Sequence, residues 1–184
     1  MKASALLIKL FVAVLAVLFL FSTAAAQNQE NTLFPENPHA TVSQTIGNTV
    51  VSIYYGRPAI RGRKMFGQLI PFNKVWPMGV EANEATMIAF SDDVLIEGEK
   101  LKAGKYSLYT IPREDKWTLI FTNVPTQWGT YNYDSAKDAL RVKVEAKKGI
   151  HIEQMMFYFT DVTSSSATVV FHWGETKVPF TVEV

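Results

Sequence analysis

Cysteine is absent from the 184 residues of this chain, and that absence removes several kinds of structure and chemistry. Without thiols there are no disulfides, no cysteine-ligated zinc, no iron–sulfur cluster, no thiol nucleophile and no lipid carried on cysteine. An excess of one charge is also lacking, because 18 basic and 17 acidic residues leave a formal net charge of +1. This balance excludes the strongly basic class of nucleic-acid-binding proteins.

Long hydrophobic runs are missing too, apart from a short one near the N-terminus. Leu10 to Phe21 is an unbroken apolar stretch of 12 residues, whereas a membrane-spanning helix needs roughly 20. Lys2 and Lys9 precede this stretch, and Ala24 and Ala26 form a small-x-small site after it. The pattern predicts a signal peptide over residues 1–26, cleaved before Gln27. The alternative interpretation is a membrane anchor that is retained.

The remaining chain has the composition of one globular domain. Residues 27–38 are polar and contain two prolines, so we expect a flexible lead-in there. No repeat or internal linker interrupts residues 39–184, which predicts a single domain. A mature chain that begins at Gln27 would be nearly neutral, with no stable membrane anchor and a periplasmic or extracellular location.

Period-two alternation of apolar and polar residues is the recurring local signal. It predicts about ten strands with turn residues between them. The expected strands are Thr41–Ile46, Val50–Tyr55, Ala85–Phe90, Val94–Ile96, Tyr106–Ile111, Trp117–Thr122, Leu140–Glu145, Ile152–Asp161, Ala167–Trp173 and Lys177–Val184. Short helices are expected only at Arg63–Leu69 and Asp134–Ala139. A sheet with one apolar face needs a second layer, so the sequence predicts an all-β fold: a single antiparallel β-sandwich, jelly-roll-like.

Two long segments lack this alternation. Gly56 to Ala82 and Asn123 to Asp134 are rich in Gly, Pro, aromatic and polar residues. Long irregular loops in a small domain often carry function. We therefore expect Trp76 to anchor the first loop, which should fold back toward the second and form a site where the two meet.

Motifs in and around these loops resemble a known family. They are Arg57-Pro58, Gly62-Arg63-Lys64, Phe66-Gly67, Val75-Trp76, Asn83-Glu84-Ala85-Thr86, Ala103-Gly104, Tyr106-Ser107-Leu108 and Gln127-Trp128-Gly129. As a set they resemble the exported bacterial domain-of-unknown-function family numbered 2911, over roughly Pro38 to Lys147. The resemblance implies export and a β-rich domain, with no established activity. The family's Trp is followed by Arg, whereas Pro77 follows Trp76 here.

The first loop contains a basic cluster that includes Arg57, Arg61, Arg63 and Lys64. Guanidinium groups bind carboxylates and phosphates with two parallel hydrogen bonds, so this cluster is a candidate anion site. The alternative is that these side chains fix the loop by pairing with Glu81, Glu84 or backbone carbonyls.

Neither the carboxylates nor the histidines form a recognisable catalytic or metal-binding pattern. Glu81 and Glu84 are close in sequence, but entry into a strand would turn them to opposite faces, which disfavours the paired carboxylates of a glycosidase. The three histidines lack metal-ligand spacing, and there is no Gly-x-Ser-x-Gly elbow. We expect no metal, no cofactor and no assignable catalytic residue.

The second loop combines tryptophan and tyrosine side chains with neighbours that carry amide and carboxylate groups. Trp128, Tyr131 and Tyr133 could stack on sugar faces, with polar neighbours fixing the orientation. The alternative is that the rings fold back and cover one end of the sandwich. The candidate ligand-binding set is thus Arg57, Arg63, Lys64, Trp76, Glu84, Trp128, Tyr131 and Tyr133.

These features favour a binding module over an enzyme. The leading hypothesis is an exported domain that binds a glycan or small anionic ligand, with no nucleic-acid partner. One alternative is a hydrolase of glycans or the cell envelope, and another is a structural partner in an envelope complex.

Cleavage before Gln27 is testable on the exported protein. Intact-mass analysis should give a chain that begins at Gln27 and lacks both N-terminal lysines, because the small-residue site follows a short apolar run. A mass that retains those lysines would contradict the prediction.

Overall fold

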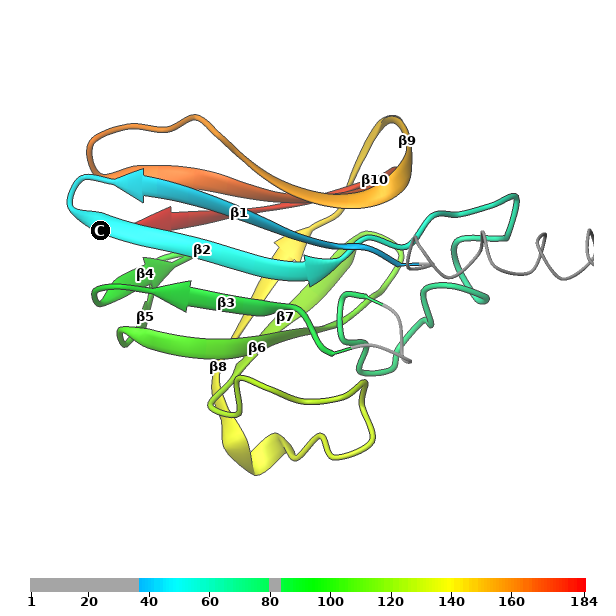
Figure 1. The fold of residues 1–184 in the computed structure, drawn as a ribbon, viewed down its shortest axis with the longest axis horizontal. Helices are drawn as coiled ribbons and strands as arrows, with labels where there is room; N and C mark the ends of the chain where they lie inside the picture. The colour runs from blue at the N-terminus through cyan, green and yellow to red at the C-terminus, as the bar shows by residue number, and fades with distance from the viewer. Residues whose placement is uncertain (1–36, 80–83) are drawn as a thin grey trace, which may run out of the picture. The chain divides into compact units, whose positions relative to one another are not determined.

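The computed structural model describes residues 37–79 and 84–184 and is built from two antiparallel sheets (Figure 1). The six-stranded sheet has the order β1-β2-β3-β6-β7-β8, and the four-stranded sheet has the order β5-β4-β10-β9. The strands are β1 (His39–Ile46), β2 (Thr49–Gly56), β3 (Met87–Phe90), β4 (Val94–Ile96), β5 (Glu99–Leu101), β6 (Gly104–Ile111), β7 (Lys116–Thr122), β8 (Asp138–Glu145), β9 (Lys147–Thr160) and β10 (Ser166–Glu183).

The all-β, two-sheet prediction with about ten strands is confirmed. Most strands of the six-stranded sheet pair with a neighbour in sequence, so their order is closer to a meander than to the interleaved order of a jelly roll. Within the described residues, no helix is long and apolar enough to cross a membrane. The predicted signal peptide and most of the predicted lead-in lie outside the described residues.

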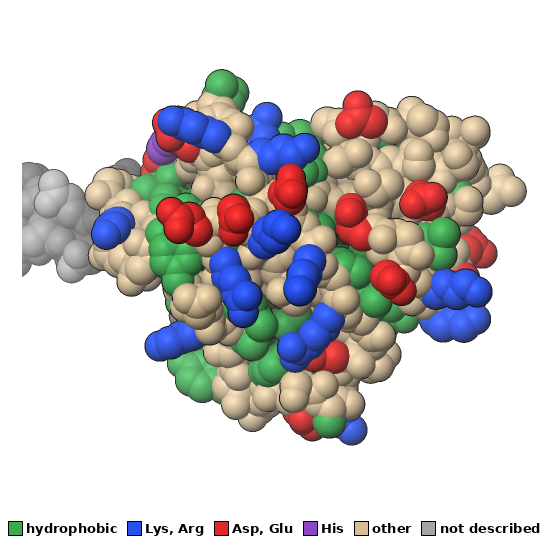
Figure 2. Space-filling view, turned by 180° about the vertical axis from the view of Figure 1, so that it is seen from behind, with side chains coloured by type: hydrophobic (Ala, Val, Ile, Leu, Met, Phe, Trp, Pro, Cys, Tyr) green, Lys and Arg blue, Asp and Glu red, His purple; other side chains and the backbone are tan. Residues whose placement is uncertain are grey.

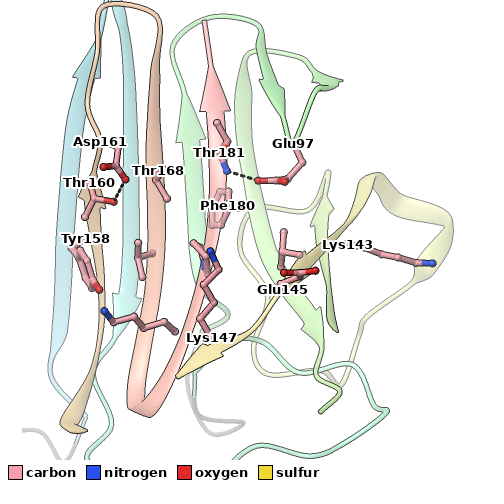
Figure 3. A pocket seen from close by; sticks show the side chains of 14 residues that line it. Glu97, Lys143, Glu145, Lys147, Tyr158, Thr160, Asp161, Thr168, Phe180 and Thr181 are labelled. Atoms are coloured by element: carbon pink, nitrogen blue, oxygen red, sulfur yellow. Dashed lines mark hydrogen bonds between the residues drawn. The ribbon is translucent and has the colours of Figure 1, made fainter. Parts of the chain in front are cut away.

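The long strand β10 contains both of the last two predicted strands. Between Thr168 and Phe180 the chain of β10 reverses direction (Figure 3), and Gly174, which lies in this segment, has a φ of +57° that glycine readily adopts. The two arms then run side by side, and at their open end Val184 N donates to Ser165 O over 2.9 Å. The predicted boundary at Trp173 therefore marks a reversal, although the hydrogen-bonding pattern continues through it.

Two local predictions differ from the structure. The segment Arg63–Leu69 forms turns instead of a helix, because Gly67 takes a φ of +86° that interrupts a right-handed helix. The helix expected at Asp134–Ala139 shrinks to the 3-10 turn Ser135–Lys137. Strand β5 was not expected, because its three residues include two charged ones. The preceding Glu97 and Gly98 have φ values of +51° and +80°, as in a two-residue hairpin turn.

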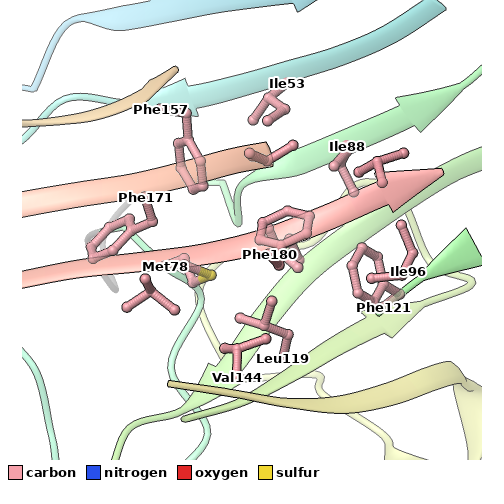
Figure 4. Packing of buried hydrophobic residues seen from close by; sticks show 14 of the residues in the cluster. Ile53, Met78, Ile88, Ile96, Leu119, Phe121, Val144, Phe157, Phe171 and Phe180 are labelled. Atoms are coloured by element: carbon pink, nitrogen blue, oxygen red, sulfur yellow. The ribbon is translucent and has the colours of Figure 1, made fainter. Parts of the chain in front are cut away.

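Aromatic side chains fill the space between the sheets, with Trp76 among them. Its ring stacks on Trp173 with centroids 6.3 Å apart and meets the edges of Trp117 and Phe171 at 6.4 and 6.0 Å. Figure 4 shows aromatic and aliphatic side chains from both sheets packed together in this core. The backbone of Trp76 exchanges two 2.8 Å hydrogen bonds with Thr110 of β6. The prediction that Trp76 anchors the first loop is confirmed.

Alternation in β8 follows the sequence prediction. Val142 and Val144 are buried, whereas Arg141, Lys143 and Glu145 are exposed. Leu140, at the start of the pattern, is half-buried. This strand therefore presents one face to the core and a charged face to water.

Strand β6 is buried on both faces because the second loop covers its outer side. Tyr109 is fully buried, and its hydroxyl lies 2.6 Å from Gln127 Oε1 and 2.9 Å from Gly129 O. The Ser107 hydroxyl donates to Val124 O over 2.7 Å. Side chains of β6 thus hold the loop to the outer face of the six-stranded sheet, through hydrogen bonds to backbone and side-chain atoms of the loop.

The depth of Trp76 predicts a large stability effect. Trp76→Ala should lower the free energy of unfolding by about 3–5 kcal/mol, because it removes a buried aromatic and leaves a cavity. Trp128→Ala makes the same change at a side chain that is 51% exposed and should lower it by less than about 1 kcal/mol. Denaturant titration measures both values, and similar losses in the two variants would contradict the anchoring role.

Candidate functional site

The predicted ligand-binding residues separate into three places in the structure. The basic side chains Arg57, Arg63 and Lys64 lie in the part of the first loop that runs beside β9. Trp76 lies in the core. Glu84, Trp128, Tyr131 and Tyr133 lie in or beside the second loop. The expected single site where the two loops meet is therefore divided. Among the described residues, Glu84, which follows the first loop, forms a bridge with Trp128 of the second loop, and Val75 and Tyr133, one from each loop, pack against the same small buried cluster.

Two of the arginines hold the first loop in place. Arg57 Nε donates to Met155 O over 3.2 Å. Arg63 donates from Nε to Ile60 O over 3.0 Å and from Nη2 to Ala59 O over 2.7 Å. These contacts favour the alternative weighed for the basic cluster, in which guanidinium groups pin the loop through backbone carbonyls.

The basic loop also borders a hollow of about 500 Å³ beside the turn of β10. Arg63, Lys147, Lys148 and His151 contribute basic groups to its lining, and Lys148 pairs with Glu175 at 3.3 Å. Lys64 is exposed, and its backbone N donates to Gln68 Oε1 over 2.9 Å. Of the predicted basic residues, Arg63 alone lines this hollow.

Trp76 lies in the core and not at a surface where a ligand could contact it. Its side chain is 1% exposed between the sheets, so no ligand at the surface reaches its ring. Its inclusion in the candidate ligand-binding set is corrected by this burial. Its aromatic area stabilises the loop instead.

Tyr133 covers the sheet. Its ring packs against Tyr109 at a centroid distance of 5.1 Å. Its hydroxyl lies 2.8 Å from Asp138 Oδ2 and also 2.8 Å from Arg141 Nη2. Burial, followed by the hydrogen bond to Asp138, raises the pKa of Tyr133 to about 12. This ring matches the alternative in which loop aromatics fold back on the sandwich.

Trp128 and Tyr131 remain at the surface, where they are 51% and 78% exposed, respectively. Trp128 forms an isolated antiparallel bridge with Glu84. The neighbouring residues strengthen the contact between these two segments, since Ala85 N donates to Gln127 O over 2.8 Å. Of the three aromatic side chains of the second loop, Tyr133 therefore covers the sheet, whereas Trp128 and Tyr131 are exposed.

The larger hollow lies over the outer face of the four-stranded sheet and was not predicted (Figure 3). Its volume is about 640 Å³, within the range of small-molecule sites. The polar and charged side chains of its lining come from three strands and two turns: Glu97, Lys143, Glu145, Lys147, Tyr158, Thr160, Asp161, Thr168, Lys177 and Thr181. Lys143 extends away from the other labelled side chains.

Two lysines stand opposite each other in this hollow. Lys147 of β9 and Lys177 of β10 are direct partners in the antiparallel register, so their side chains share one face and their like charges repel. Among the described residues, no acidic group lies within 4.0 Å of either ammonium group.

Two of the acidic groups in the lining accept hydrogen bonds from neighbouring residues and not from the lysines. Glu97 Oε1 accepts from Thr181 N over 2.6 Å, and Asp161 Oδ2 accepts from the Thr160 hydroxyl over 2.9 Å. On the face shown in Figure 2, basic and acidic side chains are interleaved. A large field of one sign is therefore not present on this face.

Little in the sequence indicates this lysine pair. Lys147 and Lys177 are far apart in the chain, and the strand register alone brings them together. Around Lys177 the signal is an apolar–polar alternation that places this lysine on the outward face, whereas Lys147 is followed by Lys148 and Gly149 and shows no such alternation. Alternation indicates the face of a residue but not its cross-strand partner.

The histidines occupy unrelated places. His39 lies near Glu84, His151 lies 3.4 Å from Glu153, and buried His172 places Nε2 2.9 Å from Ile150 O. In the part of the chain that the structure describes, no three His, Cys, Asp or Glu residues are grouped to hold a metal.

The raised pKa of Tyr133 gives a pH prediction. In unfolded chains the phenol ionises near pH 10.0, whereas in the fold it stays protonated to about pH 12. Rising pH between these values therefore stabilises the unfolded state, so stability should fall in that window. Tyr133→Phe should weaken this fall, and Tyr131→Phe should leave it unchanged. Stability curves across pH 9–12 test this, and equal slopes for wild type and Tyr133→Phe would refute it.

Comparison with known proteins agrees with the resemblance seen in the motifs. No curated protein and no solved structure matches the chain significantly. The family model described as "Protein of unknown function (DUF2911)" matches residues 37–182, which is most of the chain. The chain is therefore a member of the DUF2911 family of proteins of unknown function.

Proposed function

We propose that this protein is an exported binding module that holds a small anionic ligand in the hollow around Lys147 and Lys177. Export rests on the signal-peptide pattern of residues 1–26. Ligand binding rests on one observation, the cross-strand pair of lysines that has no acidic partner among the described residues.

The lysine pair points to an anion because it is unfavourable without one. Like charges directly opposite in an antiparallel pair destabilise the sheet. An oxyanion between the two ammonium groups replaces that repulsion with two attractions, and each ammonium group offers up to three hydrogen-bond donors. A carboxylate, phosphate or sulfate with several charged oxygens suits this geometry best.

The surroundings of the pair add polar contacts. The hydroxyls of Thr168 and Thr181 line the same hollow. Tyr158 lines it too, and its Oη lies 3.4 Å from His172 Nδ1. The acidic groups of the lining limit how much negative charge the hollow can hold, and its volume of about 640 Å³ limits the ligand to a small molecule.

The two alternatives have weaker support. For hydrolysis, Glu84 faces His39 and not a second carboxylate, while Glu81 lies outside the described residues. For a structural partner role, most of the large exposed apolar side chains lie in separate segments, such as Val50, Ile150 and Val162. Isolated apolar residues are normal on protein surfaces.

A thermal-shift experiment with citrate and inorganic phosphate tests the proposal, with sodium chloride at equal ionic strength as the control for screening. Wild-type protein should gain stability from citrate or phosphate beyond the chloride effect, by about 2.7 kcal/mol at 100 times the dissociation constant. Lys177→Gln and Lys147→Gln should each lose most of this gain. Lys105→Gln, which changes an exposed lysine on β6, should keep it.

The same variants give a second readout without polyvalent anions. At low salt, Lys177→Gln should raise the free energy of unfolding by about 0.2–1 kcal/mol, because it removes the cross-strand repulsion. A wild type that gains no more from citrate or phosphate than from chloride would refute the proposed ligand class. So would an undiminished gain in both lysine variants.

A further inference from the structure

We infer that the surface formed by Tyr54, His39, Glu84 and Trp128 is a second binding site, which takes the face of a neutral sugar. We name this surface the aromatic platform. It is independent of the lysine pair, since none of its four residues lines the hollow around Lys147 and Lys177.

Backbone pairing fixes the two principal side chains of the platform. Glu84 and Trp128 are opposite partners of an antiparallel bridge, so their side chains project on the same face with Cβ atoms about 4.5–5.5 Å apart. The hydrogen bond from Ala85 N to Gln127 O and the contact of Tyr109 Oη with Gln127 Oε1 hold this junction to the sheet. The indole and the carboxylate are therefore positioned before any ligand arrives.

Two residues from the first two strands of the six-stranded sheet continue the surface. His39 of β1 places Nε2 4.0 Å from Glu84 Oε2. The His39 ring stacks on Tyr54 of β2 with centroids 5.0 Å apart and planes at 9°. The result is a continuous series of side chains, Tyr54–His39–Glu84–Trp128, drawn from two strands and two loop segments.

All four side chains are accessible. Tyr54 and Trp128 are 38% and 51% exposed, and the side chains of His39 and Glu84 are 39% and 50% exposed. The other three tryptophans, Trp76, Trp117 and Trp173, are at most 1% exposed. Half-exposed rings beside an accessible carboxylate combine an apolar surface with hydrogen-bond acceptors.

The chemistry of these groups selects a sugar. A flat indole face packs against the C–H face of a pyranose ring, as aromatic rings do with other apolar surfaces of similar size. The Glu84 carboxylate has two acceptor oxygens, which can accept charge-assisted hydrogen bonds from two neighbouring hydroxyls. The carboxylate also repels anions, so a neutral sugar fits the platform better than an acidic one.

Trp128 supplies a direct readout for binding. Because it alone among the four tryptophans is substantially exposed, acrylamide quenching of tryptophan fluorescence reports mainly on Trp128. The probes are three neutral oligosaccharides: cellohexaose, maltohexaose and hexa-N-acetylchitohexaose. At least one of them should lower the quenching constant of wild-type protein by twofold or more at millimolar concentration.

Variants assign the effect to the platform. Measured by calorimetric titration of the active oligosaccharide, Trp128→Ala should weaken affinity at least tenfold and Glu84→Gln at least threefold. Phe72→Ala, which changes another exposed aromatic at 40% exposure, should leave affinity within twofold. Thermal unfolding of each variant confirms that it is folded, as expected for surface changes.

Clear outcomes overturn the inference. One is wild-type quenching that none of the three oligosaccharides changes at 10 mM, a concentration chosen as on the order of ten times a millimolar dissociation constant. Another is binding that survives Trp128→Ala, and a third is a preference for oligogalacturonate over the neutral probes. Lys147→Gln and Lys177→Gln should leave sugar binding unchanged, so failure of the anion site and failure of the platform are separate results.

Discussion

The stacking of Trp76 on Trp173 between the two sheets is the contact on which the rest of this structure depends. The chain leaves the six-stranded sheet after β2 and returns to the neighbouring strand β3 only after a long irregular loop. Ordering such a loop is opposed by conformational entropy of about 1–2 kcal/mol for each residue. A buried indole and two backbone hydrogen bonds to Thr110 offset part of that loss at one point. The remaining loop contacts are built around this fixed position.

That anchoring explains why the arginines of the loop are poor candidates for ligand contacts. With the loop held close to β9, Arg57 and Arg63 donate to backbone carbonyls of β9 and of the loop itself. Tyr133 and Tyr109 play the same part for the second loop, where hydroxyls and rings hold the segment to the outer face of the six-stranded sheet. Side chains whose type suggests binding thus stabilise the loops.

The groups left accessible lie on the outer faces of the two sheets and have opposite character. Over the four-stranded sheet, Lys147 and Lys177 form a cationic pair in a hollow. Beside the six-stranded sheet, Glu84 and Trp128 form a flat surface that combines a ring with a carboxylate. The first is the site we propose for an anion, and the second is the site we propose for a neutral hydroxyl-rich ring.

The sequence by itself determined the fold class and the face of most strand residues, because apolar alternation depends only on neighbours in the chain. Val142 and Val144 are buried as predicted, and Trp76 anchors the first loop as predicted. The sequence also contained the motifs that mark the family. Strand register and loop placement were decided only by the tertiary structure. Register brings Lys147 opposite Lys177 and Glu84 opposite Trp128, and it depends on packing between segments far apart in the chain. Burial likewise separated Tyr133 from Tyr131, two residues of the same type in the same loop, because only one of them lies over a sheet that needs cover.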